Sequence, residues 1–199
     1  MPTGTPLSAD TILSAAEAVI RRHGPGKATV VDVARALGVS HTAVYKHFPT
    51  KQALREAVTR RWLDPNRDEL AAVAHDDRVQ PARRLRSWLH LVLSTKQTKA
   101  REDPELFAAY AILAAECSDL AEGHVKDLLA QLAAIVAAGV ADGSFAVADS
   151  AIAARAIFDA TTLFHSLAHA HEWEAQAIHD DLDAVCTLLL DGLTAPEGQ

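Results

Sequence analysis

The chain has 199 residues, about half of them hydrophobic, and a formal net charge of −7. This composition favours a globular protein with a sizeable core and argues against a disordered chain. No apolar run approaches the roughly 20 residues of a membrane span, and the first residues lack the basic start and apolar run of a secretory signal. Two widely separated cysteines, Cys117 and Cys186, fit free thiols in a reducing compartment. We therefore expect a cytoplasmic protein without a membrane partner.

The charge is distributed unevenly along the chain. Residues 1–62 hold nine Lys and Arg against four Asp and Glu, a net charge of +5, which leaves −12 for residues 63–199. A basic head on an acidic body suits a protein that binds DNA at one end only.

Four helices are predicted in the first third of the chain. Thr29 begins the second of them with a capping box, because its hydroxyl can accept the N–H of Asp32 while the Asp32 carboxylate reaches back. Gly38 ends that helix, since glycine takes a left-handed backbone without strain. Ser40 caps the third helix and Thr50 caps the fourth. The predicted ranges are 8–23, 29–38, 40–48 and 50–64.

The remainder is also predicted to be helical, and no segment shows the alternation of a convincing strand. The expected helices cover about 66–75, 81–99, 104–117, 118–139, 149–171 and 174–192. The sequence therefore predicts an all-α fold. Residues 1–62 would form a three-helix, helix-turn-helix DNA-binding domain, and residues 63–199 a helical domain for ligand binding and dimerisation.

Residues 30–48 have the pattern of a helix-turn-helix. Ala34 is small where the two helices cross, and Gly38 supplies the turn. An apolar set would pack between the helices: Val30, Val33, Leu37, Val39 and Val44. The outward residues of the third helix are polar, cationic or aromatic: His41, Thr42, Tyr45, Lys46 and His47. Such groups reach base edges and phosphates. An ordinary pair of antiparallel helices is the alternative interpretation.

The stretch 29–54, TVVDVARALGVSHTAVYKHFPTKQAL, resembles the DNA-binding signature of TetR-family repressors. The match includes the turn and the spaced continuation Tyr45, His47, Phe48, Lys51 and Leu54. Thr42 departs from the small residue that many members carry, which affects the expected base preference. The resemblance implies a symmetric dimer that binds a palindromic double-stranded operator and releases it when a small-molecule effector binds the helical domain.

The expected roles at the DNA follow from position and chemistry. Thr42, Lys46 and His41 are candidates for base-edge contact, while Tyr45, His47 and Lys51 would hold phosphates. The start of the helix at Thr29 would offer backbone N–H groups to a phosphate. The predicted DNA-binding residues are Thr29, Ser40, His41, Thr42, Tyr45, Lys46, His47 and Lys51.

Aromatic and lightly polar residues of the middle helices are candidates for an effector pocket. They are Trp88, Phe107, Tyr110, Cys117, Phe158, Thr161 and His165. A few polar anchors in an apolar lining are typical of small-molecule sites, so we expect an apolar or aromatic effector. The alternative for each residue is a place in the hydrophobic core.

Two apolar stripes near the C-terminus are expected to form a dimer interface. The last helix offers Ile178, Leu182, Val185, Leu189 and Leu193, with Cys186 and Leu190 beside them. The preceding helix offers Ala153, Ala156, Ile157, Ala160, Phe164, Leu167 and Ala168. The alternative is that both stripes serve only the core of one chain.

Other function classes have weaker support. The sequence contains no Gly-rich phosphate loop, HExxH motif or nucleophile elbow, so we predict neither an enzyme nor a cofactor. A helical enzyme remains the lesser alternative. A metal-responsive regulator is a second alternative, because His165 and His169 would share one face of a continuous helix, with His171 nearby.

Overall fold

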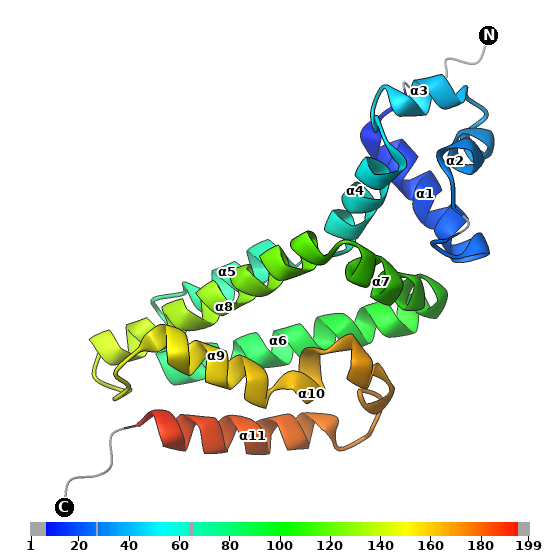
Figure 1. Ribbon diagram of the computed structural model, residues 1–199. Coiled ribbons are helices and arrows are strands. Elements are labelled where there is room, and N and C mark those ends of the chain that lie inside the picture. The colour runs from blue at the N-terminus through cyan, green and yellow to red at the C-terminus, as the bar shows by residue number, and fades with distance from the viewer. Residues whose placement is uncertain (1–6, 27, 64–65, 195–199) are drawn as a thin grey trace, which may run out of the picture. The chain divides into compact units, whose positions relative to one another are not determined.

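The computed structural model describes residues 7–26, 28–63 and 66–194, and these residues form helices joined by short turns, with no strand among them (Figure 1). The elements are α1 (Ala9–His23), α2 (Val30–Leu37), α3 (His41–Tyr45), α4 (Lys51–Leu63), α5 (Arg67–Ala74), α6 (Pro81–Glu102), α7 (Pro104–Glu116), α8 (Ser118–Ala141), α9 (Ser150–Ala160), α10 (Thr162–His165), the 3-10 helix η1 (Leu167–Glu172) and α11 (Ile178–Leu193). The all-α prediction is confirmed.

Side-chain caps explain where several helices begin. Ser8 Oγ accepts the N–H of Thr11 before α1, and Asp103 Oδ1 accepts the N–H of Leu106 before α7, each at 3.1 Å. Asp149 Oδ1 accepts two N–H groups at the start of α9. Each bond satisfies a backbone donor that has no partner within its helix. These local starts match the sequence prediction.

Contacts divide the chain into two compact units. One unit contains residues 1–65 together with 103–122, and the other contains residues 66–102 together with 123–199. The predicted domain boundary between residues 62 and 63 places α7 in the second domain, whereas α7 packs with the N-terminal helices. Apolar residues of α7 explain this packing, because Ala109, Tyr110 and Leu113 are buried in one cluster with those of α1 and α4.

The core of the first unit is built from the inward faces of α1, α2, α3, α4 and α7. Its fully or almost fully buried members include Ile12, Val33, Val44, Val58 and Leu113. Burying a side chain of this size stabilises the fold by about 1.5–3 kcal/mol before entropy costs. These residues come from five helices, so the cluster holds α2 and α3 in a defined orientation within this unit.

The second unit is organised around α6 and the larger part of α8. Trp88 of α6 is 1% exposed, and its indole N–H donates to Gln131 Oε1 of α8 at 2.8 Å. Leu132, Ile135 and Val136 of α8 are completely buried. By length and composition α8 could cross a membrane, contrary to the expectation that no such stretch exists, but core helices of soluble proteins satisfy the same criterion.

The continuous helix expected over residues 149–171 is wrong. α9 ends at Ala160, where Thr161 Oγ1 donates to the carbonyl of Ile157 at 2.8 Å. α10 ends at His165, and the next residue, Ser166, is extended. Trp173 Nε1 donates to the carbonyl of Leu163 at 2.7 Å and so satisfies an acceptor near the helix end.

This break also corrects the predicted histidine cluster. His165 ends α10, whereas His169 and His171 lie in η1, so His165 and His169 do not share a face of one helix. His165 Nε2 instead donates to the carbonyl of Phe158 at 2.9 Å. Among the residues that the structure describes, no three His, Cys, Asp or Glu side chains are placed to hold one metal ion.

Candidate nucleic-acid interface

The helix-turn-helix begins with the capping box at Thr29. The N–H of Asp32 donates to Thr29 Oγ1 at 3.2 Å, and the N–H of Thr29 donates to Asp32 Oδ2 at 3.3 Å. The hydroxyl of Thr29 also donates to this carboxylate at 2.5 Å, and these bonds lower the pKa of Asp32 below its usual value. Thr29 therefore fixes the start of α2, as predicted from the sequence.

Gly38 makes the turn between α2 and α3. Its backbone has φ 67° and ψ 27°, in the left-handed region, and its N–H donates to the carbonyl of Arg35. The N–H of Val39 donates to the carbonyl of Ala34 at 3.0 Å. Glycine takes this conformation without steric cost, so the chain can reverse after α2.

α3 and the turn that follows it are two-sided. Val44 is completely buried and Phe48 is 9% exposed, and both belong to the apolar cluster. Ser40 caps α3 by accepting the N–H of Ala43 at 3.2 Å. The opposite side is exposed and consists of His41, Thr42, Tyr45, Lys46 and His47. Lys46 and His47 follow the helix instead of lying within it, because α3 ends at Tyr45, before the predicted end at Phe48.

Two aromatic groups on this exposed side contact each other. The rings of His41 and Tyr45, one helical turn apart, meet edge to face with centroids 6.3 Å apart. The buried side of α3 fixes the direction of the exposed side, because Val44 cannot leave the core without losing its packing. α3 thus presents hydrogen-bond donors, a phenol and a cation on one face.

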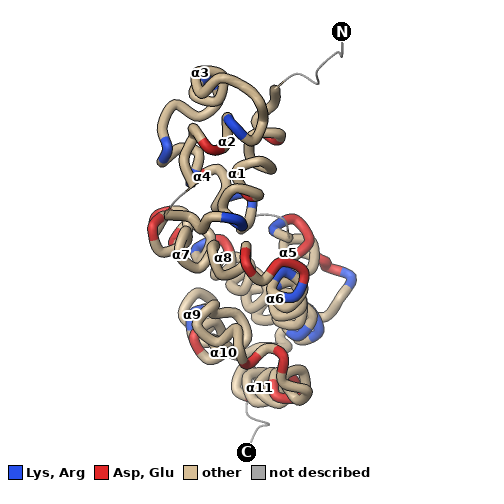
Figure 2. The backbone as a smooth tube through the Cα atoms, turned by 90° about the vertical axis from the view of Figure 1, so that its right-hand side faces the viewer, with Lys and Arg blue, Asp and Glu red and all other residues tan. Residues whose placement is uncertain are grey.

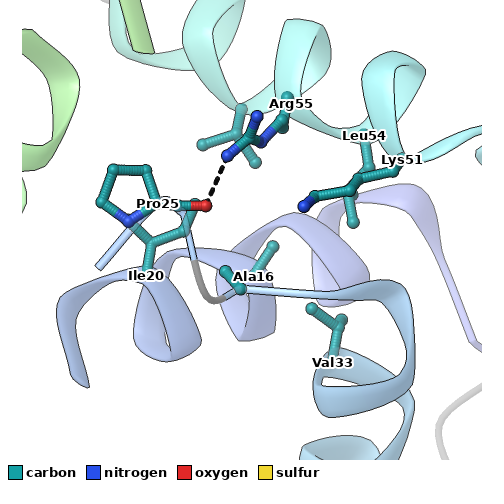
Figure 3. A pocket seen from close by; sticks show the side chains of 9 residues that line it. Ala16, Ile20, Pro25, Val33, Lys51, Leu54 and Arg55 are labelled. Atoms are coloured by element: carbon teal, nitrogen blue, oxygen red, sulfur yellow. Dashed lines mark hydrogen bonds between the residues drawn. The ribbon is translucent and has the colours of Figure 1, made fainter. Parts of the chain in front are cut away.

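Lys51 lies at the start of α4, next to a small pocket that α4 shares with α1 and α2 (Figure 3). Arg55 crosses this pocket, and its Nη2 donates to the carbonyl of Pro25 at 2.5 Å. The pocket has room for about one water molecule, which makes it a packing gap and not an effector site. Lys51 itself is exposed, as a phosphate contact requires.

Basic residues are interspersed along the helices of the N-terminal segment (Figure 2). Some of them are already paired within the unit: Arg55 contacts Glu116 at 2.8 Å, and Arg61 contacts Glu17 at 3.5 Å. Lys46 and Lys51 make no ion pair with a described residue. These two lysines are therefore available to a phosphate backbone.

The seven residues predicted to line one effector cavity fall into both units. Phe107, Tyr110 and Cys117 belong to the N-terminal unit. Tyr110 is 1% exposed and stacks on Trp62, and burial raises the pKa of its phenol. Cys117 is buried and accepts weak hydrogen bonds from Gln52 and Thr59 of α4. Within this unit, the three residues pack against helices of the N-terminal segment.

The other four residues lie in the second unit. Phe158 and His165 stack with ring centroids 4.1 Å apart. Thr161, which lies between these two residues along the chain, is completely buried. Burial lowers the pKa of His165, with a further contribution from the charge of Lys96. Trp88 is in the core of the same unit, bonded to Gln131.

Sequence reasoning missed Lys96 on α6. Its side chain is half-buried, and burial, together with the charge of Lys99, lowers its pKa to about 8. It makes no hydrogen bond or ion pair with another described residue. The sequence spacing could have identified this lysine. An apolar stripe recurs at helical intervals and ends in a cation: Leu85, Leu89, Val92 and Lys96.

Two family models match the chain. The model for the N-terminal part of "bacterial regulatory proteins, tetR family" covers residues 12–58, and the model for the "tetracyclin repressor-like, C-terminal domain" covers residues 81–186, more than half of the chain. The chain belongs to the TetR family. The α2–turn–α3 segment lies within the residues that match the family's N-terminal model.

The chain is similar to a curated protein and shares its fold with two solved proteins. An uncharacterized HTH-type transcriptional regulator of Mycobacterium tuberculosis is 33% identical over 105 residues, which are 52% of this chain and 49% of that protein. SmeT, the repressor of the Stenotrophomonas maltophilia multidrug efflux pump SmeDEF, has the same fold, with a TM-score of 0.72 at 22% identity over 96% of this chain and 93% of SmeT. FadR from Bacillus subtilis, solved with stearoyl-CoA, gives a TM-score of 0.70 at 18% identity over 94% of this chain and 100% of FadR.

Proposed function

We propose that this TetR-family regulator is a repressor that binds a palindromic operator as a homodimer and leaves it when a small molecule binds the helical region 63–199. The observation that carries the proposal is the two-sided α3, on which buried Val44 holds Tyr45 and its exposed neighbours outward. A helix of this kind fits the major groove of DNA. The protein would act in the cytoplasm, where its DNA is.

The roles of the exposed residues follow from their positions. Thr42, Lys46 and His41 are the proposed base readers, because they lie at the exposed start and end of α3. Tyr45, His47 and Lys51 are the proposed phosphate contacts. Thr29 and Ser40 use their hydroxyls as helix caps, so they would contribute through the backbone N–H groups that they orient.

Dimerisation through α9 and α11 is supported by two exposed apolar side chains. Ile152 on α9 is 70% exposed and Leu188 on α11 is 73% exposed. Much of the predicted stripe instead faces the chain's own core, because Ile157, Phe164, Leu182 and similar residues are at most 3% exposed. The proposed interface therefore uses the outer faces of these helices.

The proposed effector site is the group Trp88, Phe158, Thr161 and His165 in the second unit. Aromatic surfaces with a hydroxyl and an imidazole suit an apolar or aromatic effector. SmeT has been solved with triclosan and FadR with stearoyl-CoA, which supports an effector of substantial apolar surface. Phe107, Tyr110 and Cys117 are left out because they pack within the N-terminal unit.

Binding to DNA upstream of the protein's own gene tests this function. Fluorescence anisotropy with a labelled promoter fragment should show saturable binding that a scrambled fragment of equal length does not compete away. The double variant Tyr45→Ala with Lys46→Ala should lose this preference while keeping its helical circular dichroism. Retention of sequence-specific binding by that variant would show that α3 does not read the operator.

A further inference from the structure

Two histidines from distant parts of the chain meet on the second unit. His90 lies on α6 and His179 in the first turn of α11. Their rings are parallel within 4°, with centroids 5.7 Å apart, and their Nδ1 atoms are 3.5 Å from each other. Hydrogen bonds at the other ring nitrogens determine which nitrogen of each ring carries the proton.

Gln97 orients the ring of His179. Its Nε2 donates to the carbonyl of Trp173 at 2.6 Å, so its Oε1 is the atom that faces His179 Nε2 at 3.2 Å. Reversing the amide would place two carbonyl oxygens against each other in a buried position. His179 must therefore carry its proton on Nε2, which leaves a lone pair on Nδ1.

Asp183 orients the ring of His90 in the same way. Its Oδ1 lies 3.0 Å from His90 Nε2 and accepts from Arg86 Nη1 at 2.5 Å. A carboxylate paired with an arginine only accepts hydrogen bonds, so His90 must also carry a proton on Nε2. When neutral, His90 likewise has a lone pair on Nδ1.

When both rings are neutral, their lone pairs thus face each other across 3.5 Å, and a cation between them would be held by both rings. We propose that His90 and His179 form a binding site for a divalent transition-metal ion of the zinc, nickel or copper class. Zinc–nitrogen bonds of roughly 2.0–2.1 Å would span this gap with an angle of about 120° at the metal. Imidazole is a preferred ligand of these ions.

The surroundings of the pair resemble those of a metal-binding histidine. A ligating histidine usually donates its other ring N–H to a carboxylate or a carbonyl oxygen, which fixes its tautomer and orientation. Asp183 does this for His90, and Gln97 does it for His179. Both ligands are reachable from solvent, since His179 is exposed and the His90 side chain is 29% exposed.

The number of protein ligands determines the expected affinity for the metal ion. No third His, Cys, Asp or Glu among the described residues is placed to join the pair, so water would complete the coordination shell. Two protein nitrogens are half of a full structural zinc set, and we therefore expect micromolar affinity instead of the much tighter binding of a complete site. The site is independent of the proposed repressor function.

Calorimetric titration of the full-length, tag-free protein with zinc chloride tests the site. The expected result is one ion per chain, with binding lost in His90→Ala and in His179→Ala. His171→Ala is the matched control, because that side chain is 76% exposed in the same unit and should leave binding unchanged. Asp183→Asn should weaken binding by about 10–100-fold, since it changes the orienting partner of His90.

Imidazole ¹⁵N NMR spectra of the same sample test which ring nitrogens bind the zinc ion. Zinc should shift the Nδ1 resonances of His90 and His179 and leave their Nε2 atoms protonated. His179→Gln, which keeps a polar side chain at an exposed position, covers the case in which an alanine variant unfolds. Absence of saturable binding, equal binding by the His179→Gln variant, or zinc-induced shifts at Nε2 instead of Nδ1 would each overturn the proposal and leave a proton shared by the two rings.

Discussion

Trp62 on α4 and Tyr110 on α7 stack ring on ring, with centroids 4.5 Å apart and planes inclined by 19°. Tyr110 is almost completely buried, and its hydroxyl lies 3.4 Å from Glu17 of α1. One side chain of α7 therefore contacts two helices of the N-terminal segment. This pairing explains why α7 joins the first unit although α5 and α6 separate it from α4 along the chain.

Tyr110→Ala should destabilise the first unit by about 3–5 kcal/mol, because it removes a buried aromatic ring and leaves a cavity. Tyr110→Phe should cost only about 1 kcal/mol, since it keeps the ring and loses a long hydrogen bond to Glu17. Urea denaturation of the three proteins, monitored by tryptophan fluorescence, measures this difference. Equal stability of the wild type and the alanine variant would contradict the packing described for α7.

Three glycines should respond differently to alanine. Gly38→Ala should destabilise the protein by about 1–2 kcal/mol, because φ at this position is positive. Gly139→Ala should also destabilise it, by about 1–3 kcal/mol, because a Cβ would lie 2.1 Å from the buried ring of Phe145. Gly192, a helical glycine with open space around it, is the control, and Gly192→Ala should stabilise by up to about 1 kcal/mol.

Thermal denaturation of these three variants checks the order Gly192→Ala above wild type and the other two below it. A neutral Gly38→Ala would show that the turn between α2 and α3 does not need a left-handed residue.

The lysine contacts proposed at the DNA should appear in the salt dependence of binding. Lys51→Ala should weaken operator binding and reduce the slope of log K against log salt by about one, because one phosphate contact is lost. Arg155→Ala, an exposed cation on α9, is the control and should keep the wild-type slope. An unchanged slope for Lys51→Ala would show that Lys51 does not contact a phosphate.

Lys96 should make stability depend on pH. Its pKa is lowered to about 8 in the folded protein, so the unfolded chain binds the proton more tightly between pH 8 and the ordinary lysine value near 10.4. The free-energy cost of holding charged Lys96 in the folded state is therefore fully present below pH 8, and it falls as the pH rises towards the unfolded value. Lys96→Met should raise the free energy of unfolding at pH 7, and this gain should shrink towards pH 10.

Denaturant titrations at pH 7, 8.5 and 10 measure that gain. Lys126→Met, at an exposed position of α8, is the control and should show no comparable trend. A gain for Lys96→Met that stays constant over this range would argue against a lowered pKa of Lys96 in the folded protein.

The dimer proposal predicts the effect of a charge on the outer face of α11. Leu188→Glu should shift the protein from dimer to monomer in sedimentation velocity and weaken operator binding, because each half-site supplies only part of the affinity. Val31→Glu, at a 50% exposed position on α2, should leave the oligomeric state unchanged. A wild-type protein that is monomeric at micromolar concentration would contradict the proposed homodimer.

Features that depend on neighbouring residues could be predicted from the amino-acid sequence alone. Thr29 and Asp32 are three positions apart, and Gly38 follows α2 directly, so capping and turn chemistry predicted the helix-turn-helix. The same local patterns predicted the starts of α7 and α9 at Asp103 and Asp149. The exposed side of α3 followed from helical spacing around Val44.

Contacts between residues far apart in the chain could be read only from the folded structure. It placed Tyr110 against Trp62, ended α10 at His165 with a bond from Trp173 nearby, and brought His179 to His90. Helical periodicity indicates that a side chain faces inward, but it does not say which helix lies opposite. That choice depends on the complementary packing of whole helices, because the free energy of burial is the same for many partners and only shape and hydrogen bonding distinguish them.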